Sequence, residues 1–190
     1  MKFDTVPLGD ALYVKGRIGW KGLRIDEYLD SGEYRIINAE ALKDGHIDWS
    51  CCGYIDKERY DESPEIMLQP GDILISKDGT IGKVGFVEQL TMPSTVASGI
   101  FVIRNVKPEL FDTRFIYHFF RSSIFKAFIH SRTEGSVVPH LYQRDFETLQ
   151  FPKINIKHQK MISRIVDSFE KKIDNYIEIN DNLGGTCLAS

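Results

Sequence analysis

The sequence has little of what marks a secreted or membrane-bound protein. Its three cysteines, Cys51, Cys52 and Cys187, are an odd number at uneven spacing, which excludes a disulfide framework. Adjacent cysteines chelate one ion poorly, so we interpret Cys51 and Cys52 as small, half-buried residues and expect no metal site. There is no charged-then-apolar leader and no apolar run long enough to cross a membrane. We therefore expect a cytoplasmic protein without membrane contact.

The motifs of common catalytic sites are also missing. The sequence contains no His-Glu-x-x-His, Cys-x-x-Cys, Gly-x-Ser-x-Gly or Walker-type Gly-Lys-Ser/Thr pattern, and its five histidines are scattered. A DNA methyltransferase would need a glycine-rich loop for S-adenosylmethionine and an Asn/Asp-Pro-Pro-Tyr/Phe motif, and neither occurs. We therefore expect no catalytic residues and no cofactor.

The sequence also has no excess of positive charge, with 24 Lys and Arg against 27 Asp and Glu. The net charge of −3 argues against a strongly basic nucleic-acid binder, so any contact with DNA must come from local clusters. The chain has 190 residues, of which 42% are hydrophobic and 12% aromatic. That is enough for one well-packed domain, with a helical appendage at most.

Residues 71–87 form the most informative segment that is present. Apolar residues alternate on both sides of an Asp78-Gly79 turn, with Ile73 and Ile75 on one face and Leu74 on the other, which predicts a β-hairpin. The turn carries Lys77, Thr80 and Lys83. A hydroxyl, two ammonium groups and the backbone N–H groups of a glycine-rich corner are typical of a phosphate-binding surface. The alternative is a simple connector between strands.

Two further clusters combine polar, basic and aromatic residues. The first lies among glycines near the start of the chain and contains Lys15, Arg17, Trp20 and Lys21. Cations and an indole on one loop are suited to phosphates and unstacked bases, although charged loops are more often simply solvated. The second contains Tyr142, Gln143 and Arg144, in which the amide and guanidinium have the hydrogen-bonding groups that read adenine and guanine edges in the major groove.

Two segments have helical periodicity. Apolar residues recur at three- and four-residue spacing from Asp112 to about Arg132, which predicts one helix packed across the sheet. A second, amphipathic helix is expected from about Asn155 to Asn182, with a heptad seam of Ile162, Val166, Phe169, Ile173, Tyr176 and Asn180. Such a seam favours pairing with another helix, and folding back onto the same domain is the alternative.

Several motifs, taken together and in order, resemble one protein family. Gly71-Asp72-Ile73-Leu74, Ser76 and the run 79–83 resemble the "GDIL-S-GTIGK" run of the DNA target-recognition domain in specificity subunits of type I restriction–modification systems. Three further stretches agree: 17–23; 45–49 with Tyr54, Ile55 and Tyr60; and His140-Leu141 with 149–152 and Gln159. One departure is Pro152-Lys153, where the family usually has a Pro-Pro pair.

The resemblance implies an α/β (α+β) fold: one globular target-recognition domain with a twisted mixed sheet and packed helices, then a long C-terminal coiled-coil helix. We expect a recognition domain over residues 1–153, a pairing helix over 154–183 and a flexible tail over 184–190. Such a chain is a half-length subunit or a truncated piece.

The implied partners are double-stranded DNA, methyltransferase subunits, restriction subunits in the assembled complex, and a second copy or second recognition domain bound through the helix. Two alternatives remain open. One is a DNA-reading domain that serves another effector, such as a methyltransferase–nuclease fusion. The other is a protein-interaction adaptor with no DNA role.

Overall fold

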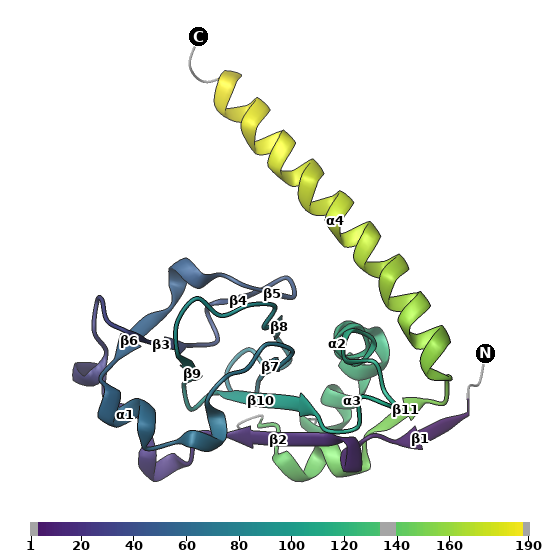
Figure 1. Ribbon diagram of the computed structural model, residues 1–190, viewed down its shortest axis with the longest axis horizontal. Coiled ribbons are helices and arrows are strands. Elements are labelled where there is room, and N and C mark those ends of the chain that lie inside the picture. Colours follow the sequence, from purple (N-terminus) through teal and green to yellow (C-terminus); the bar gives the residue numbers. More distant parts are fainter. Residues whose placement is uncertain (1–3, 134–139, 188–190) are drawn as a thin grey trace.

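The computed structural model describes residues 4–133 and 140–187 and shows a body of short strands from which one long helix departs (Figure 1). The strands are β1 (Thr5–Pro7), β2 (Leu12–Gly16), β3 (Tyr34–Ile37), β4 (Leu42–Lys43), β5 (His46–Ile47), β6 (Gly53–Ile55), β7 (Ile73–Ser76), β8 (Val84–Phe86), β9 (Ser94–Val96), β10 (Ile100–Asn105) and β11 (Gln150–Pro152). The helices are α1 (Lys57–Asp61), α2 (Thr113–Arg121), α3 (Ser123–Thr133) and α4 (Ile156–Cys187). No helix in this described part is long and apolar enough to span a membrane.

The strands form several small sheets and not the single mixed sheet that the sequence predicted. The central sheet has the order β2-β10-β7-β8 and is antiparallel throughout. Beside it lie the sheet β6-β3-β9, in which β3 and β9 are parallel, and the pairs β4-β5 and β1-β11. The mixed character is therefore confined to β6-β3-β9, in which β3 also pairs with β6 in the antiparallel sense.

The central sheet separates two hydrophobic cores, and β7 contributes to both through its two faces. Ile73 and Ile75 belong to a larger core shared with α2 and α3, whereas Leu74 faces a smaller core beneath β4 and β5. The hairpin is confirmed, with Ile75 opposite Val84 and a positive φ of 62° at Gly79. Phenylalanines dominate the larger core: Phe101, Phe115, Phe119, Phe120, Phe125, Phe146 and Phe151.

The first predicted helix is broken in two. Ser122 has extended backbone angles, φ −74° and ψ 161°, and separates α2 from α3. Its hydroxyl donates to the Phe119 carbonyl at 2.6 Å, which is an alternative to continuing the helical ladder. Apolar spacing alone could not reveal this break, because the break leaves Phe120 and Phe125 in the same core.

The end of the chain differs from the prediction in part. The 3₁₀ helix Gln143–Thr148 precedes β11, which has three residues. The last helix, α4, continues to Cys187, so the predicted end near residue 183 and a tail starting at 184 are wrong. Residues 188–190 lie outside the described part.

The Gly71-Asp72 pair has a structural role. Gly71 has a positive φ of 93°, a region that glycine adopts readily. The Asp72 side chain is fully buried and accepts hydrogen bonds from Arg104 Nε at 2.7 Å and Arg104 Nη2 at 2.8 Å. This bidentate pair ties the start of β7 to β10, so the carboxylate is not available to a ligand.

Candidate nucleic-acid interface

Two segments far apart in the sequence meet at the tip of the β7–β8 hairpin. The Leu141 N–H donates to the Lys77 carbonyl at 3.1 Å, and His140 Nδ1 pairs with an Asp78 carboxylate oxygen. These contacts bring together predicted DNA-binding residues from both segments. We call this set the turn surface: Lys77, Thr80, Tyr142, Gln143 and Arg144.

The turn surface is exposed and carries stacked cations and rings. Tyr142 is 50% exposed, and the Arg144 guanidinium lies 5.0 Å from its ring centroid. The ring centroids of His140 and Tyr142 lie 4.6 Å apart. Lys77 Nζ lies 5.0 Å from the centroid of the Phe101 ring. Gln143 and Arg144 project from the exposed first turn of a 3₁₀ helix. Exposed amide, guanidinium and aromatic groups at one place are suited to base edges and phosphates.

The turn itself is held rigid from below. Ser76 Oγ accepts from the Lys83 N–H at 2.9 Å and donates to the Thr80 carbonyl at 2.6 Å. Gly82 has a φ of 84°, and a Cβ there would lie 2.6 Å from Ile129 Cδ1 of α3. The backbone angle therefore favours glycine at position 82, and a larger residue would also displace the end of the Ile129 side chain.

Arg17 is a correction to the predicted set of exposed phosphate ligands. Its side chain is only 2% exposed, Nε donates to the Val96 carbonyl at 3.2 Å, and Nη1 donates to Ser63 Oγ at 3.4 Å. Burial lowers its pKa, and the nearby Arg59 adds to the effect. Arg17 thus connects the end of β2 to β9 and cannot contact a phosphate in this conformation.

The other predicted cations do not form one continuous patch. Lys15 is aligned with Val102 and Leu74 on the side of the smaller core, opposite to the side on which Lys77 lies. Lys21 Nζ donates to the Glu62 carbonyl, and Lys83 Nζ donates to the Ala39 carbonyl at 3.3 Å. The side chain of Trp20 lies outside the described part. DNA contacts by these residues remain predictions.

Helix α3 supplies a basic face that the sequence reasoning missed. Lys126 and His130, which are exposed and four residues apart, form this face, whereas exposed Arg132 lies on another side of the helix; α3 contains no acidic residue. The signal was present in the sequence as basic residues spaced four apart without acids between them. The strong apolar pattern of the same segment drew attention to the core instead.

The predicted seam of α4 is divided between two surroundings. Ile162 packs on the larger core and Val166 is half-buried, whereas Phe169, Ile173 and Tyr176 are 59%, 56% and 67% exposed. Asn180 is also exposed. Helix α4 extends beyond the body after its contact with α2 (Figure 1), so the second half of the seam is exposed.

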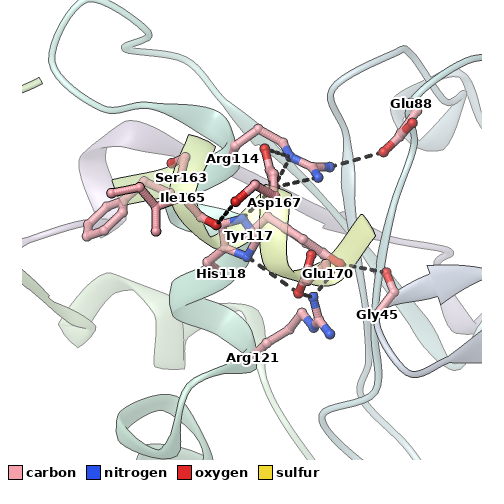
Figure 2. A network of polar contacts seen from close by, with 12 residues as sticks. Gly45, Glu88, Arg114, Tyr117, His118, Arg121, Ser163, Ile165, Asp167 and Glu170 are labelled. Atoms are coloured by element: carbon pink, nitrogen blue, oxygen red, sulfur yellow. Dashed lines mark hydrogen bonds and ion pairs between the residues drawn. The ribbon is translucent and has the colours of Figure 1, made fainter. Parts of the chain in front are cut away.

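Helix α4 docks on α2 mainly through ion pairs (Figure 2). Arg114 Nη2 lies 2.7 Å from Asp167 Oδ1, the same oxygen that His118 Nε2 approaches at 2.7 Å, and Arg121 pairs with Glu170. Burial lowers the pKa of His118. Burial alone would raise the pKa of Asp167, but the hydrogen bonds from Arg114 and His118 hold it below its usual value.

One trio in this network has the residue types of a metal site. His118, Asp167 and Glu170 offer ligand atoms within 4.8 Å of one another. Both carboxylates already pair with Arg114 or Arg121, so the positive charge that a divalent ion would bring is supplied by the chain. We therefore interpret the trio as part of the ion-pair network.

Comparison with known proteins identifies the family to which the chain belongs. Residues 2–183 match the family model "Type I restriction modification DNA specificity domain". Over 173 residues the chain is 27% identical to the type I restriction enzyme MjaVIII specificity subunit of Methanocaldococcus jannaschii, which covers 90% of this chain and 36% of that protein. The chain therefore spans about a third of the length of this curated relative.

Solved structures share the fold. The HsdS subunit from Thermoanaerobacter tengcongensis superposes with a TM-score of 0.63 and 13% identity, covering 91% of this chain and 38% of that one. The type IIG restriction endonuclease BpuSI gives a TM-score of 0.59 at 9% identity, covering 86% of this chain and 26% of that one. The family match extends over nearly the whole chain, from β1 into α4, and the chain belongs to the type I restriction–modification DNA specificity family.

Proposed function

We propose that the chain recognises a specific sequence in duplex DNA as a specificity component of a type I restriction–modification complex and has no catalytic activity of its own. The observation that carries this proposal is the turn surface, in which a domain of this family places exposed Tyr142, Gln143 and Arg144 beside half-buried Lys77 at the tip of a rigid hairpin. Rigid support matters because base readout depends on side chains held in register with the groove.

The proposed role of each residue in the turn surface follows from the chemistry of its side chain. Gln143 and Arg144 read base edges in the major groove, with Tyr142 beside them. Lys77, Thr80 and the N–H groups of the turn contact phosphates and set the orientation of the domain. Lys15, Lys21 and Lys83 are proposed as phosphate contacts apart from the turn surface, since they do not form one continuous patch with it.

The exposed part of α4 is proposed to pair with another helix. Phe169, Ile173 and Tyr176 are each more than half exposed, together with Ile165 and Ile177. Burying such side chains contributes on the order of 1 to 3 kcal/mol each before ordering costs. The partner is a second copy or a second recognition domain, with methyltransferase subunits bound to the pair and restriction subunits joining through them.

A second candidate is supported by the similarity to BpuSI. A domain with this fold in a type IIG restriction endonuclease favours a DNA reader for a different effector as the alternative. A protein-interaction adaptor without a DNA role is the remaining alternative.

Binding to random-sequence duplex at low and high salt tests the DNA role. We expect weak binding that falls with salt by a log–log slope of about −0.9 per phosphate contact. Binding that does not depend on salt, or no binding at all, contradicts the proposal and favours the adaptor. Restoration of specific DNA methylation by adding a type I methyltransferase subunit separates this function from the second candidate.

A further inference from the structure

A cavity of about 370 Å³ lies between the hairpin turn and α3. Gly79, Gly82, Lys126 and His130 are among the residues that line it. Its floor is apolar, because Ile81 and Ile129 pack there. No acidic side chain is among its lining residues in the described part of the chain.

The two basic side chains of this cavity are available to a ligand. Lys126 and His130 are four residues apart on α3, so they project from one face of the helix. Both are exposed, and within residues 4–133 and 140–187 neither side chain forms an ion pair or hydrogen bond. By contrast, Arg132 of the same helix donates to Thr148 Oγ1 at 2.7 Å.

The turn adds backbone donors on the opposite wall. The Ile81 and Gly82 N–H groups are used within the hairpin, donating to the Gly79 carbonyl at 3.0 Å and the Ser76 carbonyl at 2.9 Å. The Gly79 and Thr80 N–H groups donate to no acceptor within the described chain. An ammonium, an imidazole and the Gly79 N–H, with no acid among the described lining residues, are complementary to an anion with several oxygens.

We propose that this cavity binds a backbone phosphate of the same DNA duplex that the turn surface reads, with Lys126 and His130 as ligands. The inference rests on the proposed function and extends it to α3. Continuity supports DNA as the source of the phosphate, since the glycine turn forms one wall of the cavity and also carries Thr80 of the turn surface. The duplex backbone then runs from Tyr142–Arg144 across the turn to α3.

The test is duplex binding by the full 190-residue chain, measured by fluorescence anisotropy across a salt series. The variant is Lys126→Gln with His130→Gln, and the control is Lys157→Gln with Lys160→Gln, two exposed lysines of α4 whose side chains form no ion pair or hydrogen bond within residues 4–133 and 140–187. For each phosphate contact that the variant loses, we expect its log–log salt slope to be shallower by about 0.9. Raising the salt from about 50 to about 200 mM should then weaken the variant about 3-fold less than it weakens the unchanged chain. The control keeps the slope of the unchanged chain, and both variants keep its melting temperature.

Neutral phosphate replacement identifies the phosphate itself. Methylphosphonates are placed one at a time along the duplex, and one position should weaken the unchanged chain while having no further effect on the Lys126→Gln, His130→Gln variant. Equal slopes for variant and unchanged chain, with normal binding, overturn this inference alone. Absence of any duplex binding by the unchanged chain overturns both the inference and the proposed function.

Discussion

Asp72→Asn tests the structural role of the motif that first pointed to this family. The substitution keeps the shape of the side chain but removes the charge that Arg104 Nε and Nη2 contact at 2.7 and 2.8 Å. Asp72 is fully buried and the Arg104 side chain is 28% exposed. Removing one partner of a buried pair costs about 3 to 5 kcal/mol, and the partial exposure of Arg104 places the expected loss near about 3 kcal/mol.

Urea and thermal unfolding measure this loss. For a domain of this size, about 3 kcal/mol lowers the melting temperature by about 6 to 12 °C. The matched control is Asp61→Asn, which removes an exposed ion pair with Lys57 and costs at most about 1 kcal/mol. An Asp72→Asn protein as stable as the Asp61→Asn control refutes the reasoning. So does a folded Asp72→Asn protein with a reduced DNA salt slope, since that result would place the carboxylate in the interface.

Three other results are expected. Lys77→Gln reduces the log–log salt slope of DNA binding by about 0.9, and an unchanged slope removes Lys77 from the phosphate contacts of the turn surface. The pKa of His118 in the folded chain lies below its ordinary value of 6.5. As the pH falls below that value, the unfolded chain binds more protons than the folded chain, so the free energy of unfolding decreases. The melting temperature should therefore drop between about pH 7 and pH 5 in the unchanged chain but less in His118→Gln, and equal profiles contradict the assignment. Phe169→Asp abolishes self-association in sedimentation measurements without changing the melting temperature of the body, and a wild-type monomer at high concentration with the methyltransferase subunit present contradicts pairing through α4.

Local pattern was sufficient to predict the elements that depend on neighbouring residues. The alternation of Ile73, Leu74 and Ile75 predicted the strand and the division of these residues between its faces, and the structure adds that each face lies on a separate core. The glycine turn and the amphipathic α4 were predicted for the same reason. The break at Ser122 was missed because it preserves the apolar face on either side.

Contacts between distant residues decided the rest. The sequence suggests that Arg17 is an exposed cation on a loop. Its side chain is instead buried beside its hydrogen-bond partners Val96 and Ser63, which lie 79 and 46 positions away in the sequence. The meeting of Lys77 with Leu141, which assembles the turn surface, is equally non-local. The division of the α4 seam depends on where the helix leaves α2, and heptad spacing contains no information about that.

The central claim is that this chain selects the DNA sequence on which a methyltransferase acts. The most direct measurement maps methylated bases in DNA treated with type I methyltransferase subunits and S-adenosylmethionine, with and without this chain. We predict a methylated motif that appears only when the chain is present, built from two inverted copies of a short element separated by unread bases when two copies pair. A motif that is methylated equally without the chain, or methyl transfer by the chain alone, contradicts the account.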